Sequence, residues 1–179
     1  ISTDHLFSGN ESFVTEESGT APINNYAKTK LEGEQQVQKN CKDALIIRTN
    51  FFGWGTKYRQ SFSDFIINKL RNNETVDLFS DVFFTTILVS ELSNKVHKLI
   101  SENLSGIFNV VGSERLSKYE YGVKLANCFN LDVHLINEVS INGKLNLVKR
   151  PRDMSLSNDK LYQTLNCTIP SIGKQFQTL

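Results

Sequence analysis

Two uninterrupted apolar segments constrain the fold of this chain more than any other feature of its sequence. They are "DALIIRT" at residues 43–49 and "GIFNVVG" at residues 106–112. A strand with one face in water alternates apolar and polar residues, whereas a strand covered on both faces is apolar throughout, as in a parallel sheet flanked by helices. Both segments are therefore predicted to be buried parallel strands.

Segments with helical periodicity separate the predicted strands. Asn24 or Asn25 can cap the first helix, and Ser117 with Glu120 forms a capping box for a later one. Strands that alternate with helices indicate an α/β fold with a mainly parallel sheet. Helices are expected at residues 24–40, 61–73, 90–102 and 117–130, shorter ones after Ser157 and near Pro170, and further strands at residues 75–79, 85–89 and 132–139.

Charge and composition exclude several function classes. The 20 basic and 19 acidic residues leave a net charge of +1, so nothing favours nucleic acid as a partner. No apolar run approaches the roughly 20 residues that span a bilayer. The three cysteines are far apart and lack metal-ligand spacing. They predict reduced thiols in a cytoplasmic protein and no metal site.

The helix expected at residues 24–40 begins with "NNYAKTKLEGE", which places Tyr26 four residues before Lys30. Residues at this spacing share one helix face, with Cβ atoms roughly 5–6 Å apart. An ammonium stabilises a neighbouring phenolate, so the pair is a candidate acid–base device. The motif also recurs by chance on surface helices, and Glu34 is an alternative salt-bridge partner for Lys30.

The topology of such a sheet predicts where these residues would act. Ligands bind beyond the C-terminal ends of the strands in an open α/β sheet. One strand is expected to end at residues 1–2 and the next at residue 49, with the Tyr26 helix between them. The residues expected to meet at this edge are Thr3, Asp4, Tyr26, Lys30, Asn50, Phe51 and Phe52. Hydroxyl, phenol and ammonium together suit the acid–base chemistry of a carbonyl group.

The wider pattern resembles a known family. "STDHLFSG", "YAKTKLEGE" and "RTN" are similar to the "STDYVFDG", "YGKTKLxGE" and "RTS" segments of the extended short-chain dehydrogenase/reductase family, most of all its dTDP-4-dehydrorhamnose reductase group. The later "GIFNVVGSERLSKYEYG" and "RPRDMSLSNDKL" also resemble this group. The likeness covers nearly all 179 residues.

The resemblance implies a reductase of a nucleotide-activated 4-keto-6-deoxy sugar, with NADPH or NADH as hydride donor, that makes deoxysugar precursors of polysaccharides. Tyr26 would protonate the carbonyl oxygen, and Lys30 would make it a stronger acid and hydrogen-bond the nicotinamide ribose. Thr3 would hold the substrate oxygen. The remaining implied contacts are Asn50, Phe51 and Phe52 with the nicotinamide, and Asp4 and Arg150 with the nucleotide-sugar, where a guanidinium suits phosphate.

The resemblance also implies a domain organisation. Residues 1–74 and 90–112 would belong to a partial Rossmann-like, doubly wound sheet, and residues 75–89 and 113–179 to a smaller C-terminal α/β substrate-binding lobe. The family's G-x-x-G-x-x-G turn, which receives the pyrophosphate, has no match here. We therefore expect a piece of a longer protein that by itself is inactive and binds dinucleotide poorly. The family's tyrosine in "DYVF" is His5 in this chain.

Other interpretations stay open. A sugar epimerase would use the same site, and a non-catalytic subunit resembling the regulatory subunit of methionine adenosyltransferase would use the fold without turnover. Thr3 and Asp4 could cap a strand end, the aromatic residues after Asn50 could be a packed loop, and Arg150 could belong to a solvated basic cluster. The sugar, the choice between NAD and NADP, and the oligomeric state, a homodimer included, are not determined by the sequence.

Overall fold

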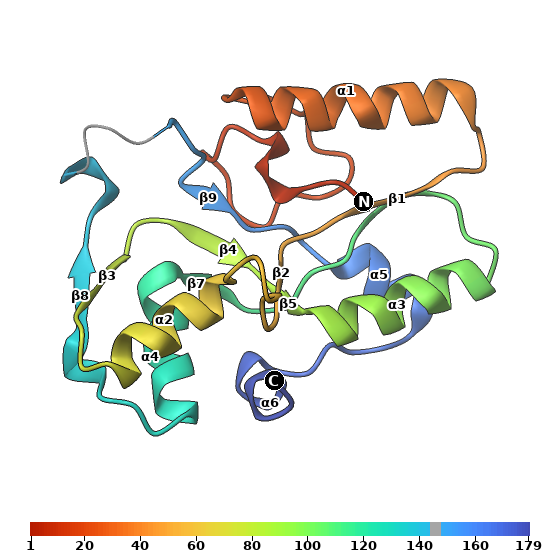
Figure 1. Cartoon of the computed structure of the whole chain (residues 1–179). Helices are drawn as coiled ribbons and strands as arrows, with labels where there is room; N and C mark the ends of the chain where they lie inside the picture. The colour runs from red at the N-terminus through yellow and green to blue at the C-terminus, as the bar shows by residue number, and fades with distance from the viewer. Residues whose placement is uncertain (144–147) are drawn as a thin grey trace.

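A computed structural model describes residues 1–143 and 148–179 of the protein (Figure 1). The predicted α/β fold is confirmed, with helices and strands that alternate along the chain. The α-helices are α1 (Asn25–Asn40), α2 (Phe62–Arg71), α3 (Val89–Ser101), α4 (Lys118–Cys128), α5 (Asp159–Leu165) and α6 (Ile172–Gln177). The 3₁₀ helices are η1 (Asp4–Leu6), η2 (Val133–Leu135) and η3 (Ile141–Gly143). The strands are β1 (Leu45–Arg48), β2 (Phe51–Phe52), β3 (Val76–Phe79), β4 (Phe83–Thr85), β5 (Ile87–Leu88), β6 (Gly106–Asn109), β7 (Arg115–Ser117), β8 (Ile136–Val139) and β9 (Asp153–Met154).

The two apolar segments form β1 and β6, which pair in parallel from Leu45 opposite Gly106 to Arg48 opposite Asn109. β2 and β5 are parallel neighbours, as are β3 and β8. β4 lies between β9, which is parallel to it, and β7, which is antiparallel. The expectation of a mainly parallel arrangement is therefore confirmed.

Some boundaries differ from those expected. Residues 1–2, which were expected to end a strand, are irregular. Ser2 donates one backbone hydrogen bond to the carbonyl of Ile47 (2.6 Å), and no strand pairing continues from it. The expected strand at residues 85–89 is divided between β4, β5 and the start of α3, and the first part of the one at residues 132–139 is η2. The capping box of Ser117 and Glu120 is present at the start of α4.

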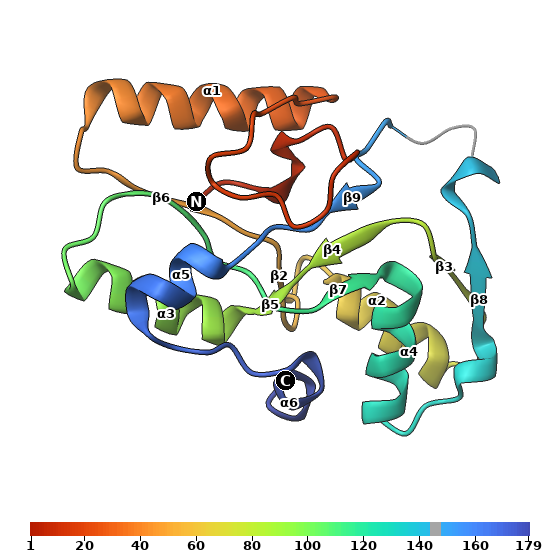
Figure 2. The same ribbon diagram turned by 180° about the vertical axis from the view of Figure 1, so that it is seen from behind.

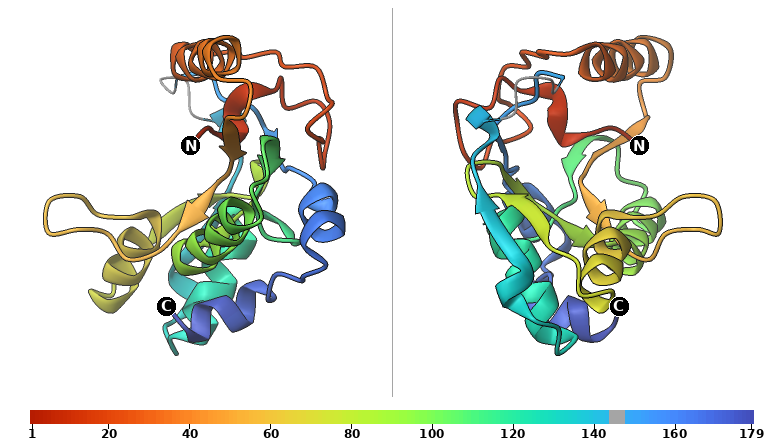
Figure 3. Two further views of the ribbon diagram at one scale, coloured as in Figure 1. Left: turned by 90° about the vertical axis from the view of Figure 1, so that its right-hand side faces the viewer. Right: turned by 60° about the vertical axis from the view of Figure 1, so that its left-hand side comes forward.

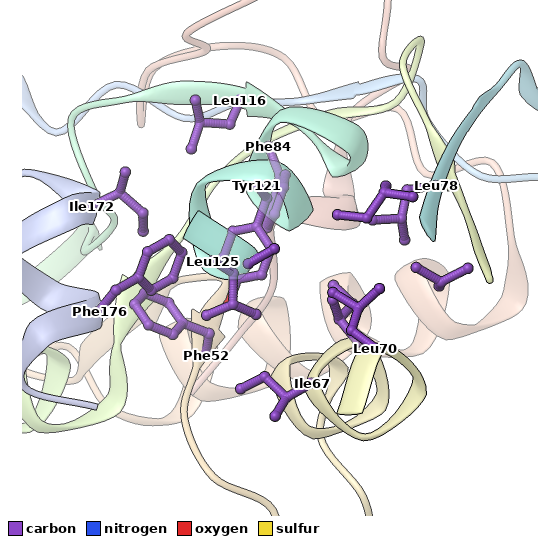
Figure 4. Packing of buried hydrophobic residues seen from close by; sticks show 14 of the residues in the cluster. Phe52, Ile67, Leu70, Leu78, Phe84, Leu116, Tyr121, Leu125, Ile172 and Phe176 are labelled. Atoms are coloured by element: carbon purple, nitrogen blue, oxygen red, sulfur yellow. The ribbon is translucent and has the colours of Figure 1, made fainter. Parts of the chain in front are cut away.

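Buried apolar residues form separate clusters. The largest surrounds Tyr121 of α4, whose ring contacts Phe52, Phe84 and Phe176 (Figure 4). The Tyr121 hydroxyl meets Ser63 Oγ at 2.8 Å. This cluster gathers residues of α2, β3, α4 and β8. A second cluster covers β1 and β6 with residues of α3 and α5. The predicted boundary at residue 74 places α2 with the first of the expected domains, although α2 packs against β3 and α4. That division stays a prediction, and residues 144–147 of the expected lobe lie outside the described residues.

Helix α1 lies over the N-terminal segment, and β3 and β8 lie at the end of the molecule away from α3 and α5 (Figures 1 and 2). The loop between β2 and α2 projects from the body (Figure 3). Glu34, one of the few buried residues of α1, forms an ion pair with Arg48 of β1 at 2.8 Å. The alternative of a Glu34–Lys30 salt bridge is therefore wrong, because Glu34 faces the interior. Within the described residues, no helix combines the length and the apolar character needed to cross a membrane.

The close approach of Gly112 to β4 and β5 gives a first testable prediction. A Cβ at this position would collide with the backbone carbonyl of the buried Thr86. We expect Gly112→Ala to lower the free energy of unfolding by about 1–3 kcal/mol, the usual cost of overpacking, as measured by urea denaturation. Gly173→Ala is the control, because a Cβ there meets nothing within 4 Å. Equal stability of the two variants would contradict the prediction.

Candidate active site

A hydrogen-bonded network joins the first residues of the chain to the end of β1. The carboxylate of Asp4 accepts from Thr3 Oγ1 at 3.2 Å and from Asn50 Nδ2 at 2.6 Å. Thr3 also caps η1, because its hydroxyl oxygen accepts from the backbone of His5. Thr3 and Asp4 are buried. Three residues that the sequence predicted to share one edge, Thr3, Asp4 and Asn50, are thus in contact.

The electrostatic environment of Asp4 is unusual for a carboxylate. Burial raises the pKa of Asp4, and the attraction of His5 and the hydrogen bond from Asn50 only partly oppose that shift. Lys118 adds a weaker attraction from across the site. The Asp4 carboxyl therefore protonates more readily than an exposed aspartate, and its hydrogen bonds fix the direction in which the Thr3 hydroxyl points.

His5 stands between this network and Tyr26. The rings of His5 and Tyr26 meet edge to face, with centroids 5.7 Å apart. Burial lowers the pKa of His5, and the positive charges of Arg150 and Lys118 also lower it, whereas Asp4 raises it. A neutral imidazole is thus favoured beside Tyr26. His5 Nδ1 is buried without a hydrogen-bond partner among the described residues.

Tyr26 and Lys30 both face the N-terminal segment. Asn24 caps α1 by accepting from the backbone of Ala27 at 2.9 Å, so the helix begins immediately before Tyr26. The side chain of Tyr26 is 55% exposed. Lys30 Nζ donates to the carbonyl oxygen of Ile1 at 2.7 Å. Because Tyr26 contacts residue 5 and Lys30 contacts residue 1, both side chains lie on the face of α1 that is turned toward the site.

Two hollows adjoin His5. The first, with a volume of about 520 Å³, is lined by Tyr26, Arg150 and the start of α1. The second, of about 310 Å³, is bordered by Asn50, Arg150 and Lys118. Its apolar wall consists of Phe79, Val82, Ile141 and Met154. Arg150 is exposed and, like His5, lines both hollows. The predicted substrate residue therefore lies beside the predicted proton donor.

The two aromatic residues after Asn50, Phe51 and Phe52, differ in their exposure to solvent. Phe51 is 54% exposed, whereas Phe52 is buried against Tyr121 and Phe176. Both line a narrower cavity of about 160 Å³, which Asn50 and Lys118 also border. Phe51 offers an open ring surface near the site. The side chain of Phe52 belongs to the largest apolar cluster and anchors β2 from inside.

Sequence reasoning missed Lys118. The capping box identified the start of α4 but gave no sign of where its first side chain would point. Lys118 borders the cavities that contain Asn50 and Arg150, and burial lowers its pKa to about 8. The signal present in the sequence was the segment "RLSKYEYG", which contributed to the family resemblance.

Comparison with known proteins identifies similar chains. The sequence model of a protein family described as the RmlD substrate-binding domain matches residues 1–178. The probable low-salt glycan biosynthesis reductase Agl14 of Haloferax volcanii is 29% identical over 99% of this chain and 61% of its own length. Methionine adenosyltransferase 2 subunit beta of Danio rerio is 30% identical over 76% of this chain and 45% of its own length. The chain thus spans less than two thirds of these curated relatives.

Solved structures share the fold. A dTDP-4-dehydrorhamnose reductase of Bacillus anthracis, in complex with NADP, superposes with a TM-score of 0.90 at 26% identity, over 99% of this chain and 62% of that one. A hypothetical dTDP-4-dehydrorhamnose reductase of Sulfolobus tokodaii gives a TM-score of 0.83 at 30% identity, over 96% of this chain and 59% of that one.

Proposed function

The chain belongs to the RmlD substrate-binding domain family, and from this premise we propose that it is the catalytic and substrate-binding part of an NAD(P)H-dependent reductase of nucleotide-activated 4-keto-6-deoxy sugars. The observation that carries the proposal is the placement of Tyr26 and Arg150 on one hollow beside the Thr3–Asp4–Asn50 network. A proton donor and an anion-binding group are then available to one substrate. The relative named as a glycan biosynthesis reductase supports a role in polysaccharide precursors.

Tyr26 is proposed to donate the proton to the substrate carbonyl oxygen. Its hydroxyl has no hydrogen-bond partner within the described residues, and Tyr26 is 55% exposed, so the hydroxyl is available to a ligand. The Thr3 hydroxyl is proposed to hold the same oxygen. Because that hydroxyl donates to Asp4, it must turn its hydrogen toward the substrate when the carbonyl binds, or else accept a hydrogen bond from a substrate hydroxyl.

The residues beside Tyr26 fit a nicotinamide cofactor. A bound NADPH or NADH would supply the hydride. Phe51 offers an exposed ring face, and Lys30 presents an ammonium that could exchange its contact with Ile1 for a ribose hydroxyl. Asn50 and Phe52 hold strand β2, which carries Phe51: Asn50 through its hydrogen bond to Asp4, and Phe52 through the largest apolar cluster. A cytoplasmic location also belongs to the proposal, and the three free cysteines support it.

The proposal predicts that Arg150→Ala mainly weakens substrate binding. Hydrogen bonds to charged groups contribute about 1.5–3 kcal/mol, so KM for the nucleotide-sugar should rise by roughly 10- to 100-fold while kcat changes little. Arg152→Ala is the control, because Arg152 is also exposed but donates to Asn142 and borders neither hollow. An unchanged KM in Arg150→Ala would count against the phosphate contact.

Turnover is the direct test of the proposed function. The protein at its native length would be incubated with a dTDP-4-keto-6-deoxy sugar and NADPH or NADH, and oxidation of the cofactor followed at 340 nm. Cofactor oxidation that depends on the sugar nucleotide supports the reductase. The matches to methionine adenosyltransferase 2 subunit beta favour a second candidate, a non-catalytic regulatory subunit. Cofactor binding without any turnover of sugar nucleotides would favour that candidate.

A further inference from the structure

Lys118 occupies a position between two cavities. It is the first residue of α4, and its backbone amide donates to Val82 at 3.0 Å, which ties the start of the helix to the strand region before β4. Its Nζ lies over the ring of Phe84, 3.3 Å from the centroid, and 5.1 Å from that of Phe62. The half-buried side chain borders both the 160 Å³ and the 310 Å³ cavity. An ammonium is therefore held at the junction of the two.

The ammonium of Lys118 differs from the other cations that lie on aromatic rings. Arg115 lies over Phe83 but also forms an ion pair with Asp153 at 2.7 Å. Lys160 lies over Phe108 and donates to a backbone carbonyl. Lys118 Nζ has neither a hydrogen bond nor an ion pair with any atom of the described residues. Cation–π contacts alone offset only part of the free-energy cost of removing an ammonium group from water.

The charges around Lys118 leave its ammonium short of negative partners. Burial lowers its pKa to about 8, and repulsion from Arg150 acts in the same direction. Asp4 attracts it, but both oxygens of that carboxyl already accept a hydrogen bond within the network described above. The 310 Å³ cavity is bordered by the cations Lys118 and Arg150 and by one carboxylate, that of Asp77, which is not among the charges that shift the pKa of Lys118. A ligand anion in this cavity would relieve the mutual repulsion of Lys118 and Arg150. A simple surface lysine that packs its methylene stem would keep its ammonium in water.

We propose that Lys118 is a specificity-determining residue that binds the diphosphate of the substrate opposite Arg150. The inference rests on the proposed function for the identity of the substrate as a nucleoside diphosphate sugar. Two cations on one cavity suit a group with two phosphates, and the apolar wall formed by Phe79, Val82 and Met154 suits a base or a deoxysugar beside it. A nucleoside monophosphate brings one phosphate to this cavity and should therefore gain less from Lys118 than a diphosphate does. Lys118 therefore selects for the second phosphate.

Titration calorimetry with thymidine diphosphate and thymidine monophosphate tests this inference on the protein at its native length. Lys118→Met should weaken diphosphate binding by roughly tenfold or more and leave monophosphate binding nearly unchanged, whereas Lys118→Arg should retain most of the preference. Lys124→Met is the matched control, because Lys124 lies on the same helix, is exposed, and pairs with Glu114 away from the cavities. Equal diphosphate affinity in wild type and Lys118→Met would overturn the inference.

A measurement on the unaltered protein keeps the inference testable if Lys118→Met unfolds. Acetic anhydride at pH 8 acylates neutral amines, and mass spectrometry reports each lysine separately. Inorganic diphosphate should slow acylation of Lys118 several-fold and leave Lys124 unaffected. Equal acylation of Lys118 with and without diphosphate would overturn the inference. Because neither experiment requires turnover, diphosphate binding that depends on Lys118 in a protein without reductase activity would reject the proposed function alone, whereas turnover without that dependence would reject the inference alone.

Discussion

Replacing Tyr26 by phenylalanine is expected to lower kcat by roughly 10²- to 10⁴-fold, the usual contribution of a positioned general acid. The substitution removes only the hydroxyl. The ring can keep its edge-to-face contact with His5 at 5.7 Å between centroids, and the side chain is 55% exposed, so stability should change little. Steady-state kinetics of the protein at its native length, with a 4-keto-6-deoxy sugar nucleotide as substrate, would measure kcat and KM separately. KM should stay within a few-fold of the original.

Tyr162→Phe is the matched control for this experiment. Tyr162 lies on α5, is 52% exposed and borders neither of the hollows beside His5. It should therefore lose no activity. If Tyr26→Phe retained the kcat of the original protein, the Tyr26–Lys30 pair would be an ordinary surface pair, and the site would need another proton donor.

The largest expected effect on stability comes from the buried ion pair between α1 and β1. Arg48 donates to Glu34 through Nε at 3.1 Å and through Nη2 at 2.8 Å, and both side chains are less than 5% exposed. Arg48→Met leaves an unpaired carboxylate in the interior, which typically costs about 3–5 kcal/mol. We expect a loss of that size in the free energy of unfolding measured with urea, and loosening of the helix that carries Tyr26.

A double substitution separates the cost of leaving a buried carboxylate unpaired from the loss of the ion pair itself. Glu34→Leu combined with Arg48→Met removes both charges, and replacement of a buried ion pair by apolar residues is often nearly neutral. The double variant should therefore be more stable than Arg48→Met alone. Lys69 and Glu74 form an exposed pair that serves as the control, and Lys69→Met should cost no more than about 1 kcal/mol. An Arg48→Met variant as stable as the Lys69→Met variant would show that the interior pair is not desolvated.

The sequence by itself determined the elements and their class. The continuous apolar segments at residues 43–49 and 106–112 became β1 and β6, and the capping residues Asn24 and Ser117 mark the observed starts of α1 and α4. The shared helix face of Tyr26 and Lys30 was also readable. Each of these features depends on residues within about four positions of one another, or on a hydrophobic repeat of two or 3.6 residues. Both kinds of information are present in the local sequence.

Only the tertiary structure decided which distant side chains meet. Asn50 donates a hydrogen bond to Asp4, 46 positions away in the sequence. Glu34 forms its ion pair with Arg48 and not with Lys30. Lys118 borders the same cavity as Arg150. Glu34 illustrates the reason. Its spacing allowed a pair with Lys30, but an interior carboxylate must find its partner where packing removes water, and that partner came from β1. Burial is set by all the elements that close over a residue, so neither its extent nor the resulting charge pairs follow from local sequence.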